Sequence, residues 1–335
     1  LLRMGNEQDV VNAVIFFFFR YVKLYYWSRS YCRWRLFSKL TIIMNPKSAE
    51  SRLCIGTANF GLKYGINKKK PLKLKYIQEI LQLAKNNKIN FLDTAISYKS
   101  SEKKIGLSKV KNFKTISKIN NFPKKNKKIE NWIFNKVRSS CKKLNVKKLY
   151  GLLIHDTDEL LDIERSKKIF NAFDYLKKKN IVKHIGLSIY NPKELDNHFS
   201  KYKFEIVQLP INIFDNRFLK SKWLKKLKKK RIKIFARSIF LKGLLLKGPK
   251  KINKKFIKCK KNISEFEKFV LSKNISKEEA CIRYILNFKE IDKIIIGINS
   301  KQQLINNISY SKKKKLIVPR KLILNDISIL DPRNW

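Results

Sequence analysis

The stretch Asn90-Phe-Leu-Asp-Thr-Ala95 is a short apolar run with an ionisable side chain, Asp93, near its end and Tyr98 just beyond it. Two later apolar runs finish in a similar way, with Lys118 and His155 at their ends. Continuous apolar runs of this length are typical of parallel strands that are covered by helices on both faces. The three runs therefore predict buried strands with ionisable groups at their carboxyl ends.

The same alternation continues along the chain from Ser51 onward. Between the apolar runs lie segments with helical spacing, as at Ile77, Ile80, Leu81 and Ala84. Strand–helix units repeated eight times fit a closed barrel, whose usual size is about 250 residues with insertions. The eight apolar runs are 53–56, 90–95, 113–119, 149–155, 184–190, 206–211, 232–239 and 293–298.

An open, doubly wound sheet would produce the same alternation of strands and helices. Such a sheet normally carries a GxGxxG turn after its first strand. The glycines of Gly56-Thr-Ala-Asn-Phe-Gly61 have the wrong spacing for that turn. We therefore expect an α/β fold, a (β/α)8 TIM barrel that forms a single domain over residues 44–335.

The composition allows a large core but gives the chain an unusual charge. Of the 335 residues, 44% are hydrophobic, and 78 Lys and Arg against 25 Asp and Glu give a formal net charge of +53. The lysines are spread over nearly every segment together with many Asn and Ile residues, which AT-rich codons favour. We interpret the charge as a solvated surface and expect no specific nucleic-acid site, although non-specific binding to polyanions at low salt follows from charge alone.

Five scattered cysteines without CxxC pairs indicate reduced thiols in a cytoplasmic protein, and we expect no metal site.

Residues 1–43 do not share the pattern of the rest. Their apolar run from Val10 to Phe19 is shorter than the roughly 20 residues needed to span a bilayer, so we expect no membrane span. Arg20 and Lys23 follow the run, whereas a signal peptide places its positive charge first. We expect a non-core extension with translation starting at Met44; the alternative is an aromatic, basic segment that lies on an anionic membrane surface.

In a barrel of this kind the reacting groups come from the carboxyl ends of the strands. Asp93, Tyr98, Lys118 and His155 stand at three consecutive strand ends. A neighbouring ammonium lowers the pKa of a tyrosine hydroxyl, a carboxylate holds that ammonium, and a histidine can donate a hydrogen bond to a carbonyl oxygen. The set therefore suits proton donation during hydride addition to a carbonyl. The competing interpretation is a structural Asp–Lys salt bridge with an unrelated tyrosine.

Several motifs resemble the aldo-keto reductase family in its usual order: Ile55-Gly-Thr-Ala-Asn-Phe-Gly61, Asn90-Phe-Leu-Asp-Thr-Ala95 with Tyr98, Ile116-Ser-Lys118 and Leu152-Leu-Ile-His155. The resemblance covers roughly residues 51–312. It implies a catalytic tetrad of Asp93, Tyr98 as proton donor, Lys118 and His155, and a nicotinamide cofactor.

The resemblance also implies where the cofactor lies. Ser188 and Gln208 would bind the nicotinamide amide, the loop Arg237–Phe240 would contact its ring, and the segment from Gly297 to Asn307 would hold the adenosine end, where a phosphate benefits from a helix amino terminus. The implied cofactor contacts are Gly56, Thr57, Ser188, Gln208, Arg237, Ser238, Phe240, Gly297, Asn299, Gln303, Asn306 and Asn307.

Two positions depart from the family pattern. Lys99 follows the tyrosine where many members have glycine, which would change the pocket mouth. Asn299 stands where many members carry an arginine for the 2′-phosphate of NADP, and Lys301 offers a point charge instead. We expect NADP(H), with NAD(H) as the alternative.

The segment Ala236-Arg-Ser-Ile-Phe-Leu-Lys-Gly-Leu-Leu245 resembles a bacterial subgroup often associated with surface-sugar pathways. The basic loop 247–261 after the seventh strand would embrace the pyrophosphate of a nucleotide-linked sugar, or it is a disordered lysine-rich insertion, which we favour.

The sequence thus predicts an NAD(P)H-dependent oxidoreductase of the alcohol dehydrogenase type that reduces a small aldehyde or ketone, which can be sugar-linked. A catalytically slow nicotinamide-binding sensor or regulatory subunit is the alternative. A nucleic-acid-binding protein would need a localised basic face. The substrate, the physiological direction and the oligomeric state stay open.

Overall fold

The computed structural model describes residues 51–66, 70–123 and 128–335. The expectations for residues 1–43, an extension before the true start or a segment on a membrane surface, fall outside the described residues. Within the described ranges, no helix combines the length and the apolar character that crossing a bilayer requires.

Eight parallel strands pair in sequence order and close into a barrel, as the sequence predicts. The barrel closes where β1 pairs with β8, with Leu53 opposite Ile294 and Gly56 opposite Gly297. Each strand lies in one of the eight expected apolar runs or overlaps it by most of its length. The strands are β1 (Leu53–Gly56), β2 (Phe91–Asp93), β3 (Lys114–Ile119), β4 (Leu149–Ile154), β5 (Val182–Ser188), β6 (Ile206–Pro210), β7 (Lys233–Arg237) and β8 (Lys293–Gly297).

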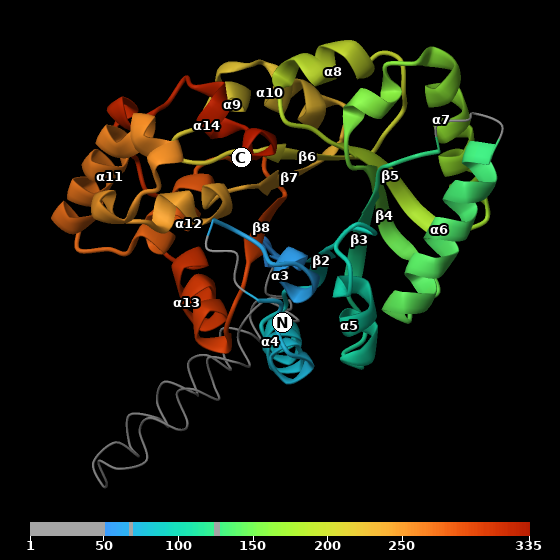
Figure 1. The fold of residues 1–335 in the computed structure, drawn as a ribbon, viewed down its shortest axis with the longest axis horizontal. Helices are drawn as coiled ribbons and strands as arrows, with labels where there is room; N and C mark the ends of the chain where they lie inside the picture. Colours follow the sequence, from blue (N-terminus) through green and yellow to red (C-terminus); the bar gives the residue numbers. More distant parts are fainter. Residues whose placement is uncertain (1–50, 67–69, 124–127) are drawn as a thin grey trace, which may run out of the picture. The chain divides into compact units, whose positions relative to one another are not determined.

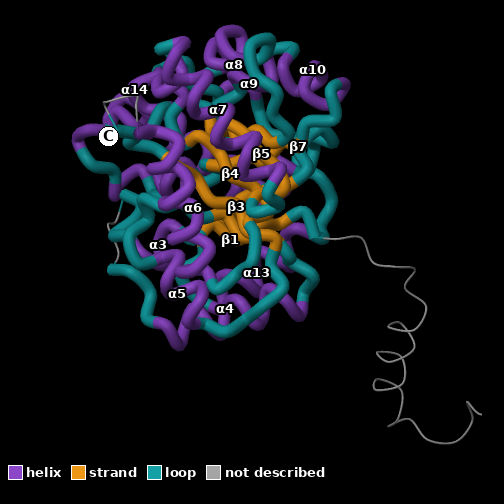
Figure 2. The backbone as a smooth tube through the Cα atoms, turned by 90° about the vertical axis from the view of Figure 1, so that its right-hand side faces the viewer, coloured by secondary structure: helices purple, strands orange, loops and turns teal. Residues whose placement is uncertain are grey.

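Helices surround the barrel and cover its outer face (Figures 1 and 2). Helix α4 shows why: its residues Ile77, Ile80, Leu81 and Ala84 recur at helical spacing and are fully buried. The described α-helices are α3 (Ala58–Gly61), α4 (Leu74–Asn86), α5 (Ser101–Leu107), α6 (Ile129–Leu144), α7 (Ile163–Lys178), α8 (Pro192–His198), α9 (Arg217–Lys220), α10 (Trp223–Lys229), α11 (Lys260–Ser272), α12 (Lys277–Ile285), α13 (Lys301–Ser311) and α14 (Ile327–Leu330).

The middle of the barrel is filled by side chains and is not a channel. One buried cluster contains a residue from nearly every strand, and Phe91 and Phe235 meet in it edge to face at 5.6 Å between ring centroids. Because apolar side chains fill this layer, buried polar side chains such as Asp93 and Lys118 collect above it, at the carboxyl ends of the strands. The cluster consists of Cys54, Phe91, Ile116, Leu153, Ile206, Phe235 and Ile295.

For the basic loop 247–261 the sequence analysis favours a disordered insertion, and this prediction is wrong. It is folded into two short 3₁₀ helices, η5 (Pro249–Lys251) and η6 (Lys254–Cys259), and is not a disordered insertion. The physical reason is apolar burial: Cys259 and Phe256 are buried, and the Phe256 ring packs edge to face on Trp335 with centroids 4.7 Å apart.

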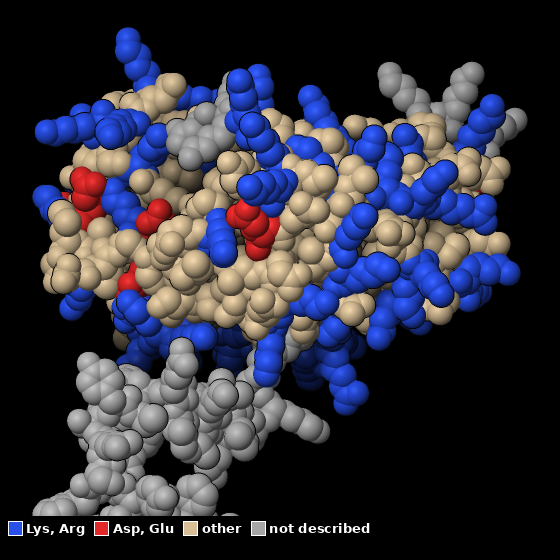
Figure 3. Space-filling model, turned by 90° about the horizontal axis from the view of Figure 1, so that it is seen from below, with Lys and Arg blue, Asp and Glu red and all other residues tan. Residues whose placement is uncertain are grey.

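Lysine and arginine side chains are scattered over the face seen in Figure 3 and are not gathered into one stripe. The four cysteines in the described part of the chain, Cys54, Cys141, Cys259 and Cys281, are free and buried.

Gly61 allows the first helix of the barrel to approach the tyrosine loop closely. A Cβ atom at this position would lie 2.0 Å from the carbonyl oxygen of Tyr98 and 2.4 Å from the backbone nitrogen of Ser101. Both neighbours are backbone atoms, which cannot turn aside as a flexible side chain can. The absence of a side chain at Gly61 therefore helps to fix the position of Tyr98.

We expect Gly61→Ala to lower the free energy of unfolding by about 1–3 kcal/mol or more, because the added methyl group forces the backbone of residues 98–101 to move. Gly248→Ala is the matched control, since its Cβ would meet only a flexible Glu267 carboxylate at 3.3 Å. Urea denaturation of both variants measures the difference. Equal stability of the two variants would contradict this account of the close approach.

Candidate active site

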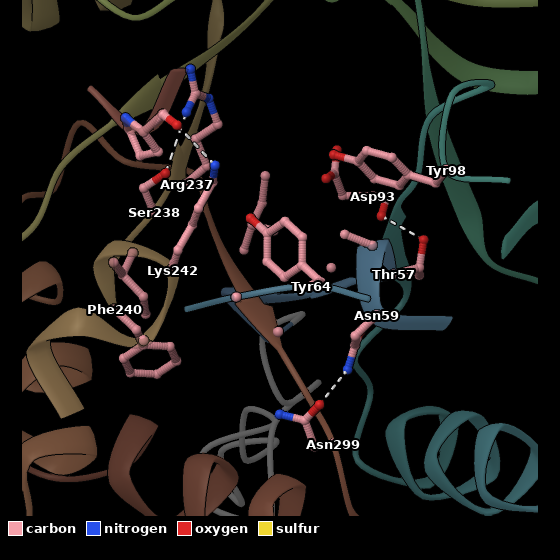
Figure 4. Close-up of a pocket in the computed structure, with 18 of the residues that line it drawn as sticks. Thr57, Asn59, Tyr64, Asp93, Tyr98, Arg237, Ser238, Phe240, Lys242 and Asn299 are labelled. Atoms are coloured by element: carbon pink, nitrogen blue, oxygen red, sulfur yellow. Dashed lines mark hydrogen bonds between the residues drawn. The ribbon is translucent and has the colours of Figure 1, made fainter. Parts of the chain in front are cut away.

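The four ionisable residues singled out from the sequence line one pocket at the carboxyl ends of the strands. Asp93 is the last residue of β2, Lys118 lies in β3, and His155 directly follows β4. Tyr98 lies in the loop between β2 and α5, and its side chain enters the same pocket (Figure 4).

Lys118 and Asp93 form a buried ion pair. The Lys118 Nζ lies 2.7 Å from Asp93 Oδ1 and also donates to the Thr94 carbonyl oxygen at 2.7 Å. The Gln208 amide donates a further hydrogen bond to the same Asp93 oxygen. Both charges are almost completely removed from solvent, so their mutual attraction and these hydrogen bonds must offset a large desolvation cost.

Tyr98 stands beside both Lys118 and His155. The Lys118 Nζ lies 5.1 Å from the centroid of the Tyr98 ring, and the His155 ring centroid lies 5.9 Å from it. Burial, and next the negative charge of Asp93, raise the pKa of Tyr98 above its ordinary value, while Arg237 acts in the lowering direction. The sequence analysis predicts that Lys118 lowers this pKa, but the pKa is raised, because burial and the Asp93 carboxylate outweigh the stabilisation of the phenolate by the ammonium.

His155 is held as a neutral imidazole. Burial, followed by the positive charges of Lys118 and Arg237, lowers the pKa of His155 to about 3. Its Nδ1 lies 3.4 Å from the Ser97 hydroxyl oxygen. A neutral imidazole has one donor and one acceptor nitrogen, so a Ser97 hydroxyl that donates to Nδ1 leaves the proton on Nε2.

Most of the residues implied as cofactor contacts line the same pocket. Gln208 is fully buried beneath it and reaches the site through Asp93. Asn306 is exposed and accepts a hydrogen bond from Gln302, whereas Asn307 is buried, and neither belongs to the pocket lining. The implied residues that do line it are Gly56, Thr57, Ser188, Arg237, Ser238, Phe240, Gly297, Asn299 and Gln303.

Buried acceptor atoms that lack a hydrogen-bond partner show whether the site suits a nicotinamide dinucleotide, because a bound cofactor would have to supply the missing donors. Gln208 Oε1 and Asn307 Oδ1 are both buried without a hydrogen-bond partner among the described residues. Such atoms cost free energy unless a donor reaches them. The nicotinamide carboxamide is a donor of the required kind for Gln208, which pairs with the pocket-lining Ser188 across β5 and β6, so this end of the pocket suits the cofactor. Asn307 lies outside the pocket lining and does not test the adenine end.

The structure also brings in residues that the sequence analysis did not select. Tyr64, Tyr190, Lys242 and Pro332 line the pocket, and Asn59 joins its β1 and β8 sides through hydrogen bonds to Ile298 and Asn299. Tyr190 ends the fifth apolar run, and Lys242 lies in the segment after the seventh strand. Their positions near strand ends could therefore have identified both as pocket residues. Tyr64 and Pro332 had no such signal, because neither belongs to an apolar run: Tyr64 lies in the loop between α3 and α4, and Pro332 begins the short 3₁₀ helix η8 (Pro332–Asn334).

Lys99, the departure from the family's glycine, has a left-handed backbone conformation with φ of 47°. Glycine adopts this region without steric cost, which explains a preference for glycine there. The Lys99 side chain is exposed and does not line the pocket.

The model of the aldo/keto reductase family matches residues 52–317. The chain belongs to the aldo-keto reductase family. Members of this family are oxidoreductases that use nicotinamide cofactors and act on small carbonyl compounds, which agrees with the pocket described above.

Solved structures show the same fold. An aldo-keto reductase from Bacillus halodurans, in its holo form, is 16% identical with a TM-score of 0.61, and the match covers 79% of this chain and 88% of that chain. A protein from Pseudomonas aeruginosa described as an aldo-keto reductase is 16% identical with a TM-score of 0.58, covering 79% and 91%. No curated protein matches the sequence.

We expect Lys118→Met to lower the free energy of unfolding by about 3–5 kcal/mol, because it leaves the Asp93 carboxylate buried without a counter-charge. The double variant Asp93→Asn with Lys118→Met removes both charges and should recover much of this loss. Chemical denaturation of the two variants tests the buried pair. A double variant that is less stable than Lys118→Met would show that the ion pair is not the source of the effect.

We expect the His155 imidazole to remain neutral down to about pH 4, since its pKa is lowered to about 3. The unfolded chain binds a proton on this residue near its ordinary pKa of about 6.5, so the folded state loses stability as the pH falls from there towards 3. A His155→Gln variant should lose less stability between pH 7 and pH 4.5 than the unsubstituted protein. Imidazole NMR titration gives the pKa directly, and a midpoint near 6.5 would refute the burial argument.

Proposed function

We propose that this aldo-keto reductase reduces an aldehyde or ketone to an alcohol with Tyr98 as the proton donor and NADP(H) as the preferred cofactor. The observation that carries the proposal is the convergence of Tyr98, Lys118, Asp93 and His155 on one pocket that the implied cofactor residues also line. An isolated structural salt bridge would not require the tyrosine and the histidine beside it.

The bound cofactor would supply a hydride to the carbonyl carbon, and the carbonyl oxygen then needs a proton. Tyr98 keeps its hydroxyl proton over the ordinary pH range because its pKa is raised, so the donor form is present before the reaction. When the proton leaves, the Lys118 ammonium, 5.1 Å from the ring centroid, stabilises the phenolate that forms. Asp93 holds Lys118 in place and does not itself touch the substrate in this proposal.

His155 would orient the carbonyl group. In the tautomer with Nδ1 accepting from Ser97, the Nε2–H can donate a hydrogen bond to the carbonyl oxygen. Its lowered pKa keeps it a neutral hydrogen-bond donor and not a competing acid. The division of roles is then plain: Tyr98 moves the proton and His155 positions the oxygen that receives it.

The cofactor would be held along the pocket from β5 to α13. Ser188 and the free Gln208 Oε1 suit the nicotinamide carboxamide. The adenosine end would lie near Asn299, Gln303 and the start of α13, whose first residue, Lys301, is exposed and offers a positive charge to a 2′-phosphate. The preference for NADP(H) over NAD(H) rests on that charge.

We also propose that the folded barrel occupies residues 44–335 and that the protein acts in the cytoplasm. Four free, buried cysteines support a reducing compartment, where thiols remain unpaired.

We expect Tyr98→Phe to lower kcat for aldehyde reduction by about 10²–10⁴-fold while the dissociation constants for NADPH and NADH stay within about twofold, because the ring remains and only the acidic proton is lost. Cofactor fluorescence and steady-state kinetics measure the two effects. Full turnover by Tyr98→Phe would exclude Tyr98 as the donor. A single slow turnover by the unsubstituted protein with tight cofactor retention would favour the sensor or regulatory subunit instead.

A further inference from the structure

A glutamate that the proposed mechanism does not use is buried behind the strand that carries Lys118. Glu102 is the second residue of α5, and its exposed fraction is 1%. Glutamate is seldom buried this completely unless a cation accompanies it. Among the residues that the structure describes, the hydrogen-bond partners of its side chain are two serine hydroxyls, and no lysine or arginine pairs with it. Its burial therefore has a reason other than charge pairing.

The two hydroxyls come from different layers of the barrel. Ser117 Oγ, on β3, donates to Glu102 Oε1 at 2.7 Å, and Ser140 Oγ, on α6, donates to the same oxygen at 2.6 Å. Both serines are buried. A carboxyl oxygen can accept two hydrogen bonds and each hydroxyl has one proton to give, so both donors are committed to Glu102. Glu102 thus joins α5 to a strand of the barrel and to the next helix.

Ser117 is the residue directly before Lys118 on β3. Successive side chains of a strand point to opposite faces of the sheet, so Ser117 points towards the helices while Lys118 points into the barrel. A hydrogen bond that holds Ser117 from outside therefore also fixes the backbone from which the Lys118 side chain starts. This support matters because the ammonium of a lysine lies at the end of a flexible stem.

Ser101, the first residue of α5, holds the helix against the other side of the ion pair. Its hydroxyl donates to the carbonyl and hydroxyl oxygens of Thr57, both at 3.0 Å, and the Thr57 hydroxyl donates to the Asp93 carbonyl oxygen at 2.9 Å. A third hydroxyl, Thr94 Oγ1, lies 3.3 Å from Ser101 Oγ. Because each hydroxyl has one proton, the first two bonds leave Thr94 as the donor to Ser101. The chain of hydrogen bonds runs in one direction and ends on the backbone of Asp93.

Two further contacts keep α5 in place. The backbone nitrogen of Ser101 donates to the Tyr98 carbonyl oxygen at 3.0 Å. On the side of α6, a Cβ atom at Gly106 would lie 2.1 Å from the Lys143 carbonyl oxygen, so the two helices are in close backbone contact. Glu102 is therefore held at a fixed place, and the tyrosine loop and β3 are both bonded to the same turn of helix.

We propose that Glu102 is a positioning residue for the proton transfer. Through Ser117 it fixes β3 and so keeps the Lys118 ammonium beside the Tyr98 ring. The Lys118 Nζ lies 5.1 Å from the centroid of that ring, and the stabilisation that an ammonium gives to a phenolate falls as this distance grows. The inference rests on the proposed reductase function and adds to it a group outside the pocket lining. Glu102 touches neither substrate nor cofactor, and no proton passes through it.

The test measures the chemical step on protein that has NADPH bound. Glu102→Met keeps the length of the side chain and removes the acceptor, so Ser117 is released. We expect the single-turnover rate constant for NADPH oxidation to fall by about 10–100-fold, as for a misplacement of about 1 Å, while the Kd for NADPH stays within about twofold. Glu102→Gln keeps an acceptor oxygen and should recover most of the rate.

Stopped-flow fluorescence with protein in excess over NADPH gives this rate constant, with butanal, glyceraldehyde and 4-nitrobenzaldehyde as the probes. Only cofactor-bound protein contributes to the signal, so a partly unfolded variant does not lower the rate constant.

Glu279→Met is the matched control. Glu279 is also buried, but it lies in α12 and pairs with Arg283 and Lys313. Its substitution should lower the stability of the fold and leave the rate constant within about twofold. A similar loss of rate in Glu279→Met and Glu102→Met would assign the effect to a general loosening of the fold and overturn the inference.

A double-mutant cycle tests whether Glu102 acts through Ser117. Ser117→Ala should reproduce most of the rate loss, and adding Glu102→Met should lower the rate by no more than about twofold further, since partners in one hydrogen bond do not act independently. Rate losses that multiply in the double variant would contradict the proposed route. If Glu102→Met does not fold, Ser117→Ala carries the test alone. Unchanged rates in Ser117→Ala overturn this inference alone, whereas no turnover of any probe by the unsubstituted protein overturns the reductase function with it.

Discussion

The buried ion pair between Lys118 and Asp93 is the constraint on which the rest of the site depends. Neither charge is tolerated inside a protein without the other, and their 2.7 Å contact is completed by the Thr94 carbonyl and the Gln208 amide. Groups from β2, β3 and β6 are thereby tied together above the apolar layer of the barrel. Tyr98 and His155 are neighbours at 5.9 Å between ring centroids, and the Lys118 charge is fixed beside the Tyr98 ring.

The pair also explains the protonation of its neighbours. A free ammonium beside Tyr98 would favour the phenolate, but Asp93 cancels much of that field and burial raises the pKa of the hydroxyl. His155 feels burial and two positive charges, and its pKa falls to about 3. The pocket therefore holds a protonated phenol and a neutral imidazole, the two forms that a carbonyl reduction needs from a proton donor and an orienting group.

The side of the pocket that carries Arg237 and Lys242 has a different origin. Its residues come from the loop after β7 and from the carboxyl-terminal turn, and they are joined by contacts between Lys242 and Pro332 and between Arg333 and Tyr190. The folded basic loop supports this turn through the packing of Phe256 on Trp335. The strand ends thus provide Asp93, Lys118 and His155, and the loop after β7 provides the charges of Arg237 and Lys242.

The sequence by itself determined the barrel and the four ionisable residues. Parallel strands covered on both faces must be continuously apolar, so the eight runs and any polar residue at their ends are visible without coordinates, as at Asp93 and His155. The sequence did not reveal Tyr64, Tyr190 or Pro332 as pocket residues, nor the raised pKa of Tyr98. These depend on which irregular segments meet across the mouth of the barrel and on how far each group is removed from water, and both are properties of three-dimensional packing that no local pattern of residues records.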